Sequence, residues 1–289
     1  MADNGNFQFK SLANTDFDTL YKAFSIAFAN YDFQVNELQL KSMFKRRGFN
    51  SELSFAMFDG DKIASFLCIG IGNYNGIPTA YDTGTGTLPD YRGRGLSSKI
   101  FEYAAPVLRE KNIKQYLLEV LQHNTNAISA YTKAGFEITR DYNFYVQKKE
   151  EVINKIKTPG IQCSIKQIKL EDYESIADFW DFTPSWQNSF ESLKRAASDI
   201  ITLGAFVDGR LAGYCVFAPG TGDIGQIAVD KNFRRKGIAS LLLGEVSKMN
   251  VKDVLKTVNI VSSSEAITGF LASKNINVSG KLYEMIKKI

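Results

Sequence analysis

Several features that define common classes of protein are scarce or absent in this chain of 289 residues. Its three cysteines, Cys68, Cys163 and Cys215, are odd in number and far apart, so they do not suggest a disulfide framework. No uncharged apolar stretch reaches the length of about 18 residues that a membrane span needs. Residues 1–15 lack the basic start and apolar core of a secretory signal. We therefore expect a cytoplasmic protein without a membrane partner.

An excess of charge of one sign is also missing. The 35 lysines and arginines nearly balance the 31 acidic residues, which leaves a net charge of +4. A nucleic-acid-binding surface needs concentrated positive charge, and neither half of the chain has it. The Arg-Gly-Arg-Gly sequence at 92–95 is typical of RNA-binding segments only when it is repeated in a disordered chain. We therefore expect no nucleic-acid partner.

The chain contains the same short basic loop twice. The two copies are Arg92, Gly93, Arg94, Gly95, Leu96, Ser97 and Arg234, Arg235, Lys236, Gly237, Ile238, Ala239. Each copy follows an apolar, strand-like run and precedes an amphipathic helical run. Both loops therefore lie where the N–H groups at a helix N-terminus can bind an anion. This position predicts a cofactor that carries phosphate.

The sequence around the two loops repeats as well. The predicted elements, in order, are a helix, an Asp-Gly hairpin and a strand, at 16–29, 52–68 and 115–121 and again at 171–179, 202–217 and 256–261. The hairpins make part of each sheet antiparallel, and the strand, loop, helix and strand around each basic loop require a parallel crossover. We therefore predict an α/β fold (α+β mixed sheet) of two tandem domains, each a central mixed β-sheet flanked by helices.

A boundary is predicted where the composition becomes least like that of a core. Residues 148–157 are rich in charge, and Pro159 and Gly160 follow them. We predict an N-terminal domain at 1–150, a linker at 151–160 and a C-terminal domain at 161–289.

The loops and the segments around them resemble the GNAT superfamily of acyl-CoA-dependent N-acetyltransferases. The family loop consists of Arg or Gln, two residues, Gly, one residue, and then Gly or Ala. The second copy matches this pattern fully, and the first has Ser97 at the last position. After the first loop the chain also carries the series typical of the family's last conserved segment, Asn124, Ala127, Tyr131, Gly135 and Phe136. The resemblance covers nearly the whole chain and implies a tandem of two such domains.

The resemblance implies how the first half would bind acetyl-CoA. The diphosphate would bind the loop amides, with positive charge added by Arg92 and Arg94, or by Arg234 and Lys236 in the second half. Two splayed strands would hold the pantetheine arm through the backbone of Thr85, Gly86 and Thr87. A backbone N–H there would also stabilise charge on the thioester oxygen. Gly84 and Gly86 fit a close approach of the ligand, or a β-bulge.

The resemblance also implies which residues carry out the chemistry. Tyr131 occupies the position of the family's general acid, which protonates the departing thiolate, while a core tyrosine is the alternative interpretation. Asn124 matches a residue that contacts the pantetheine arm, and helix capping is its other possible role. Asp82 and Glu119 lie on the strands that should flank the gap, so either could accept a proton through water. No metal site is expected.

The second half departs from the family at these positions. Alignment of Ala127 with Ala266 places Phe270 opposite Tyr131 and Ser263 opposite Asn124. Phenylalanine cannot protonate a thiolate. We therefore expect the first domain to be catalytic and the second to be degenerate, or to bind CoA without efficient turnover.

The resemblance implies an acetyl-CoA-dependent N-acetyltransferase that acts on a primary amine of a small molecule or peptide by direct attack in a ternary complex. Phe28 and Glu37, in the aromatic and acidic stretch 28–50, suit a cationic amine, although helix packing explains them equally well. His123, the only histidine, is another candidate for acceptor binding. The alternatives are a non-catalytic acyl-CoA sensor or scaffold and a tRNA-dependent aminoacyl-transferase of the tandem-GNAT type.

Overall fold

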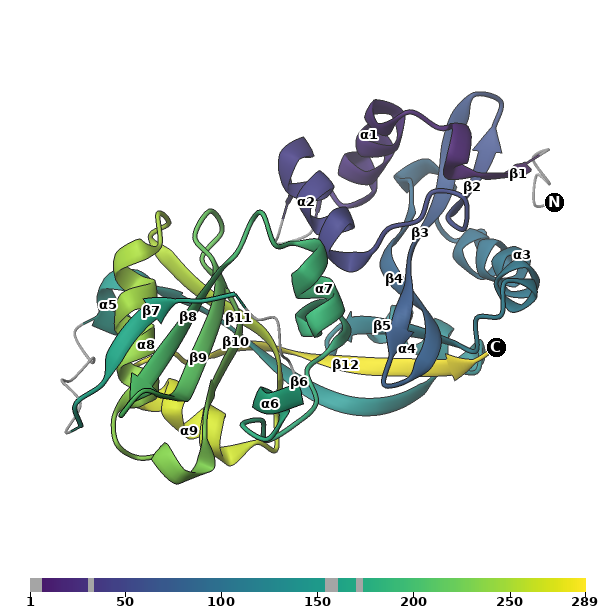
Figure 1. The fold of residues 1–289 in the computed structure, drawn as a ribbon. Helices are drawn as coiled ribbons and strands as arrows, with labels where there is room; N and C mark the ends of the chain where they lie inside the picture. Colours follow the sequence, from purple (N-terminus) through teal and green to yellow (C-terminus); the bar gives the residue numbers. More distant parts are fainter. Residues whose placement is uncertain (1–6, 31–33, 154–160, 170–173) are drawn as a thin grey trace. The chain divides into compact units, whose positions relative to one another are not determined.

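The computed structural model describes residues 7–30, 34–153, 161–169 and 174–289. The chain forms two compact units: Met1–Thr139 with Glu284–Ile289, and Arg140–Tyr283 (Figure 1). Each unit contains β-strands with helices packed on them, which confirms the predicted α/β class. Within the described ranges, no helix combines the length and apolarity needed to cross a bilayer.

The first unit is built on a mixed sheet. Its strand order is β1 (Gln8–Ser11), β2 (Phe55–Asp59), β3 (Lys62–Tyr74), β4 (Ile77–Thr87) and β5 (Gln115–Leu121), followed by the end of β12 (Val278–Lys288). The pairs from β1 to β4 are antiparallel, whereas β4 and β5 are parallel. The predicted hairpin is present between β2 and β3, where Gly60 has a φ of 60°. The parallel pair also confirms the predicted crossover.

Helices cover both faces of the first unit's sheet. They are α1 (Phe17–Ala27), α2 (Glu37–Arg47), α3 (Leu96–Glu110) and α4 (Thr125–Lys133). Helix α1 starts where the Asp16 carboxylate accepts a hydrogen bond from Thr19 N at 2.8 Å. It buries Leu20 and Phe24 in an aromatic core with Phe66 of β3. Helix α3 buries one stripe of side chains, Leu96, Ile100, Ala104 and Leu108.

The second unit repeats this plan. Its strand order is β12, β6 (Glu137–Lys148), β11 (Val254–Val261), β10 (Asp223–Val229), β9 (Arg210–Ala218), β8 (Ile201–Val207) and β7 (Ser164–Gln167). Its helices are α5 (Lys149–Ile153), α6 (Glu174–Ala177), α7 (Phe190–Arg195), α8 (Ile238–Met249) and α9 (Glu265–Ser273). Strands β10 and β11 are parallel, and the other pairs between β7 and β10 are antiparallel.

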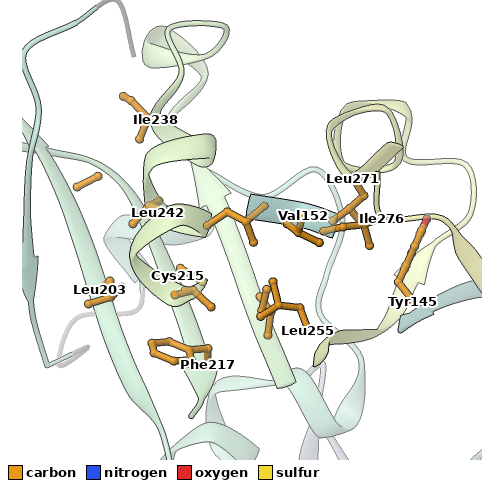
Figure 2. Packing of buried hydrophobic residues seen from close by; sticks show 14 of the residues in the cluster. Tyr145, Val152, Leu203, Cys215, Phe217, Ile238, Leu242, Leu255, Leu271 and Ile276 are labelled. Carbon is orange, nitrogen blue, oxygen red and sulfur yellow. The ribbon is translucent and has the colours of Figure 1, made fainter. Parts of the chain in front are cut away.

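Two buried clusters fill the second unit. The larger one joins Ile238 and Leu242 of α8 to Cys215, Phe217 and Leu255 of the sheet (Figure 2). The smaller one contains Tyr214 and Val216 together with Phe179. Successive side chains of a strand point to opposite faces. The alternation along β9 therefore places the two clusters on opposite faces of the sheet.

The division into units differs from the predicted boundary at 151–160, of which 154–160 lie outside the described residues. Strand β6 begins in the first unit, and its residues Tyr142–Lys148 pair with β11 in the second. Val152 of the short helix α5 is fully buried in the larger cluster of the second unit. In the described part of this segment the charged residues Lys148–Glu151 belong to a strand and a helix, which composition alone cannot distinguish from a linker.

The last six residues of the chain complete the first unit. Glu284 is only 2% exposed and accepts hydrogen bonds from Thr139 Oγ1 at 2.8 Å and from the Tyr74 hydroxyl at 3.5 Å. Lys287 Nζ donates to Ala134 O at 2.5 Å, at the end of α4. The first unit therefore depends on residues that the sequence places at the far end of the second half.

We predict that a chain ending at Tyr283 has a destabilised first unit. The truncation removes the buried Glu284 contacts and Met285, which is 0% exposed, and loss of such a methionine alone costs about 2–5 kcal/mol. Hydrogen exchange of the β5 amides should accelerate, while that of the β8 amides stays slow. Lys288→Ala, which changes an exposed side chain, is the control, and unchanged exchange in β5 would contradict the prediction.

Candidate functional site

The first basic loop presents an uncapped helix N-terminus. Gly93 and Gly95 have left-handed φ angles of 77° and 69°, and Gly95 is the N-cap of α3 without a side-chain cap. A Cβ added at either glycine would meet nothing within 4 Å, so the backbone conformation rather than space requires glycine there. The first amides of α3 therefore have no side-chain acceptor at the N-cap, as an anion site needs.

The second loop has the same backbone conformation. Gly237, the N-cap of α8, has a φ of 90° and no side-chain cap, and Arg235 has a φ of 63°. A non-glycine residue in this region is strained, although the chain keeps the conformation. Both copies therefore fold to one geometry despite their different sequences.

The arginine that opens each loop braces the fold. Arg92 Nε donates to Thr87 O at 3.2 Å, and its Nη2 donates to Ala27 O, at the end of α1, at 2.8 Å. Arg234 makes the equivalent bonds to Val229 O at 3.1 Å and Phe179 O at 2.9 Å. Each guanidinium thus ties a strand end to the end of a helical segment, α1 in the first unit and α6 in the second. The sequence suggests that these arginines contact an anion. In the structure their guanidinium groups donate instead to backbone carbonyls.

The second basic residue of each loop also contacts its own turn. Arg94 Nη2 donates to Asp90 O at 3.3 Å, and its guanidinium lies 5.5 Å from the centre of the Tyr91 ring. Lys236 Nζ donates to Asn232 O at 3.2 Å and lies 5.1 Å from the Phe233 ring. Both side chains are exposed, so their charge remains near the loop amides.

The strands beside each loop pair only at one end. The parallel ladder of β4 and β5 joins Thr79–Tyr81 to Gln115–Leu117 and ends there, so Asp82–Thr87 lie beyond it. In the second unit the ladder of β10 and β11 is reduced to Asp223 opposite Lys256. Each unit thus has the predicted splay, which begins at equivalent positions, after Tyr81 in the first unit and after Asp223 in the second.

The splay exposes backbone N–H groups of β4. Leu88 N donates to Ala64 O of β3. Because successive N–H groups along an antiparallel strand point in opposite directions, the N–H groups of Thr85 and Thr87 point away from β3. The carbonyl of Thr87 on that edge accepts from Arg92. A bulge at Thr83 precedes this stretch, since Cys68 pairs with Gly84 and Ile69 with Asp82. Gly225 forms the same bulge in β10.

The glycines of β4 serve helix packing. A Cβ on Gly84 would lie 2.8 Å from the Phe24 ring, and one on Gly86 would lie 2.3 Å from the Phe66 ring and 3.0 Å from Ala27 Cβ. These glycines therefore let α1 approach the sheet. Packing against Phe24 and Phe66 is thus a reason for glycine at both positions that does not involve a ligand, and the β-bulge alternative is present at the adjacent Thr83.

The two candidate carboxylates lie on opposite faces of the sheet. Glu119 accepts a hydrogen bond from the Tyr81 hydroxyl, and the Arg47 guanidinium of α2 lies 6.0 Å from the Tyr81 ring. Asp82 follows Tyr81 on the strand and points to the other face, where its carboxylate accepts from Thr85 Oγ1 at 2.6 Å and from Gly84 N at 2.8 Å. Burial raises the pKa of Asp82 to about 6, although both hydrogen bonds oppose the shift.

Helix α4 brings Tyr131 to the Asp82 face. The Tyr131 ring lies 5.5 Å from Phe136, which in turn lies 5.8 Å from Tyr116 of β5. Burial raises the pKa of Tyr116, and the charges of Asp82 and Tyr131 add to the shift. Asn124 Oδ1 accepts from Ala127 N at 3.2 Å, so its capping role is present.

Sequence reasoning missed Tyr116. Its side chain is 1% exposed, and its hydroxyl has no hydrogen-bond partner among the described residues. A buried hydroxyl without a partner is costly and marks a place for water or a ligand. The only available signal is a tyrosine within the apolar run of β5.

Phe28 and Glu37, the residues suggested for an acceptor site, have packing partners. Phe28 lies 4.5 Å from the Phe24 ring, and Glu37 forms an exposed ion pair with Lys41. Tyr31 and Phe33 of the same stretch lie outside the described residues. His123 is exposed at the turn after β5.

The second unit contains a cavity of about 1090 Å³. The loop residues Arg234–Ser240 line it together with the unpaired parts of β10 and β11. The positions that carry Asp82 and Tyr131 in the first unit hold Ile224 and Phe270 here. The cavity thus lacks these two candidate groups. The sequence pattern of the loop did not predict the other lining residues, such as Trp180, Tyr214 and Asn259.

Comparisons with known proteins agree with this geometry. Residues 17–136 and 164–252 match the acetyltransferase (GNAT) family. A tandem GNAT protein from the clavulanic acid biosynthesis pathway has a similar structure, with 12% identity, coverage of 98% of each chain and a TM-score of 0.75. A GCN5-related N-acetyltransferase from Sphaerobacter thermophilus has 14% identity, coverage of 98% of this chain and 95% of that one, and a TM-score of 0.73. No curated protein matches the sequence.

The repeated loop and splayed strands define an acyltransferase fold present twice in one chain. The chain belongs to the GNAT family of acetyltransferases.

We predict that Arg234→Met destabilises the second unit by about 1.5–3 kcal/mol, because it removes charged hydrogen bonds to two carbonyls and to Asp181. Denaturant unfolding measures the loss. Lys231→Ala, which removes an exposed charge from the same turn, should change the stability by less than about 0.5 kcal/mol. Equal effects of both variants would show that the hydrogen bonds of Arg234 do not stabilise the second unit.

We also predict a pH signature for Asp82. Its pKa rises from 3.8 to about 6 on folding, so between these values the folded state binds more protons than the unfolded state. This group's contribution to stability therefore increases as the pH falls from about 7 to 4. Asp82→Asn should remove that part of the pH dependence of the unfolding free energy, and Asp61→Asn, at an exposed turn, should not. Identical pH profiles for wild type and Asp82→Asn would contradict the assignment.

Proposed function

We propose that the chain is an acetyl-CoA-dependent N-acetyltransferase whose chemistry takes place in the first unit. The observation that carries the proposal is that Asp82 belongs to the splayed strands β4 and β5 on either side of the first loop and Tyr131 lies on the same face, whereas the second unit has Ile224 and Phe270 at these positions. The donor, the acceptor class and the residue roles below are part of this proposal.

The first unit has groups suited to each part of the donor. The loop amides and the N-terminus of α3 bind the diphosphate, because their N–H groups and the helix dipole favour negative charge. The outward N–H groups of Thr85 and Thr87 bind the pantetheine arm and stabilise charge that develops on the acyl oxygen. When bound, acetyl-CoA supplies a thioester that is activated towards amines.

Tyr131 acts as the general acid. Its phenol donates a proton to the sulfur as the bond between carbon and sulfur breaks, so the thiol leaves in neutral form. Asn124 holds the start of α4 through its cap and thereby orients this helix.

Glu119 is the better placed of the two carboxylates to accept the amine proton. It lies on the face of the sheet that carries Tyr81 and α2, opposite the face with Tyr131, so acceptor and acid approach from different sides. The amine nitrogen bonds to the acyl carbon and loses a proton to Glu119 through water. Asp82 holds the bulge that precedes Thr85 and remains a second candidate for the base.

The acceptor is a primary amine of a small molecule or peptide. The charge of Glu119 attracts the ammonium form of such an amine before it loses a proton.

The second unit binds a CoA thioester without efficient turnover. Three observations support this role: the loop keeps its conformation, the cavity lies beside that loop, and Phe270 cannot donate a proton. The acid candidate of the first unit thus has no counterpart beside this cavity.

We predict that Tyr131→Phe lowers kcat by about 100-fold or more, because general acid catalysis contributes factors of this size, with little change in affinity for acetyl-CoA. Thiol release over a panel of amines and a binding titration measure the two quantities. The control is Tyr103→Phe, since Tyr103 is 42% exposed on α3. Wild-type rates in Tyr131→Phe would remove Tyr131 from the mechanism.

The loops provide a second arm of the same experiment. Gly95→Asp places a carboxylate and an unfavourable φ at the anion site of the first unit and should abolish transfer, whereas Gly237→Asp should leave transfer intact. Activity that survives only in Gly95→Asp would place the chemistry in the second unit. Tight binding of acetyl-CoA without transfer to any amine would favour a sensor, and transfer from a charged tRNA would favour the aminoacyl-transferase. Absence of CoA binding would overturn the proposal.

A further inference from the structure

Asn259 of β11 lines the cavity of the second unit and is the most unusual residue in it. Its side chain is 1% exposed, and its backbone has a left-handed φ of 60°. Asparagine tolerates this region better than most residues, but a buried strand rarely contains it. Such strain persists where the surrounding structure enforces it, and it is common at binding sites.

A β-bulge produces this conformation. Thr257 pairs with Tyr145 and Ile260 with Asn143, so Val258 and Asn259 together lie opposite Phe144 alone. Bulges redirect a side chain and interrupt strand pairing. This one lies beyond the single pair that joins β11 to β10, where the two strands have separated.

One end of the Asn259 amide is held and the other is not. Its Nδ2 donates to Ser185 Oγ at 3.0 Å, while its Oδ1 has no partner among the described residues. The neighbouring polar groups of the cavity satisfy one another: Trp180 Nε1 donates to the Tyr214 hydroxyl at 2.6 Å, and that hydroxyl donates to Gln226 Oε1 at 2.8 Å. Among the buried side-chain atoms that have no hydrogen-bond partner within the described chain, Asn259 Oδ1 is the one whose residue lines the cavity.

The first unit does not have this group. The alignment of Ala266 with Ala127 places Val120 of β5 opposite Asn259. An unpaired buried amide lowers stability compared with an apolar residue, so its presence in one unit alone indicates a ligand contact specific to that unit.

The charge around the cavity defines the ligand. Arg235 and Lys236 provide positive charge at the loop, while Asp181, an acidic residue of the lining, forms an ion pair with Arg234 at 2.8 Å. Away from the loop the lining contains one more cation, Lys274, whose Nζ lies 5.9 Å from the centre of the Phe270 ring, together with apolar side chains and neutral amides and hydroxyls such as Ile260 and Thr257. These surfaces suit a molecule with an anionic end and a neutral arm that contains amides.

We propose that the side-chain amide of Asn259 binds an amide of the pantetheine arm of CoA in the second unit. A secondary amide has one hydrogen-bond donor, its N–H, and one acceptor, its carbonyl oxygen. It can therefore pair with the Asn259 side chain whether the oxygen or the nitrogen of that side-chain amide faces the ligand. This inference rests on the proposed binding of CoA by the second unit. The Asn259 contact would add a side chain to the backbone groups that bind the arm. The site would then recognise the pantetheine arm as well as the nucleotide.

The test compares two ligands in the full chain carrying Gly95→Asp, which confines binding to the second unit. CoA contains the arm, and 3′-phosphoadenosine 5′-diphosphate has the same nucleotide end without it. Asn259→Gly keeps a residue that favours the left-handed backbone. It should weaken CoA binding about 3- to 10-fold, the effect of one neutral hydrogen bond, and leave the affinity for the nucleotide unchanged. Gly237→Asp should weaken both ligands.

Asn143→Ala is the matched control, because Asn143 is also buried with an unpartnered Oδ1 but does not line the cavity. It should leave both affinities unchanged. If Asn259→Gly loses nucleotide binding through misfolding, Ser185→Ala, which releases the Asn259 amide without altering β11, should reduce CoA binding selectively. Wild-type affinity for CoA in correctly folded Asn259→Gly would overturn the inference. Failure of both ligands to bind the Gly95→Asp chain would instead refute the proposed CoA site.

Discussion

The bridge that an arginine forms between a strand end and the end of a helical segment, α1 or α6, is the interaction on which each candidate site depends. Arg92 joins Thr87 to Ala27, and Arg234 joins Val229 to Phe179. With its donors directed to these carbonyls, the arginine fixes where the strand ends. The loop that follows can then turn through two left-handed residues and leave the helix amides uncapped. An anion site made of backbone N–H groups needs a fixed loop conformation, because the backbone alone sets the direction of those groups.

Sequence patterns predicted the parts of this protein that depend on local conformation. The glycines before α3 and α8, the hairpin at Gly60 and the apolar stripe of α3 follow from φ preferences and helical period, and all are present. The bulge at Thr83 and the buried Tyr116 depend on strand register and three-dimensional neighbours, which the sequence does not display. Gly84 illustrates the difference: its need for a small residue is evident, but the cause, the Phe24 ring, comes from another element.

The two units have diverged in complementary ways. In the first, the Phe24 and Phe66 rings pack against the glycines of β4, and the titratable groups Asp82, Glu119 and Tyr131 remain at the splayed strands. In the second, Gln226 and Tyr214 form a hydrogen-bonded network, and a large cavity lies beside the loop. The second unit therefore keeps the loop geometry but has Ile224 and Phe270 where the first has Asp82 and Tyr131, as the proposed binding without turnover requires.

The position of Glu284 in the first unit has a consequence for how the protein folds as it is synthesised. Its partners Thr139 and Tyr74 lie 145 and 210 residues earlier in the chain. A ribosome has therefore made the whole second half before these contacts can form, and closing so long a loop slows folding. The first unit therefore stays incomplete until residues beyond the second half have been made, so the unit whose synthesis begins first cannot be the first to finish folding.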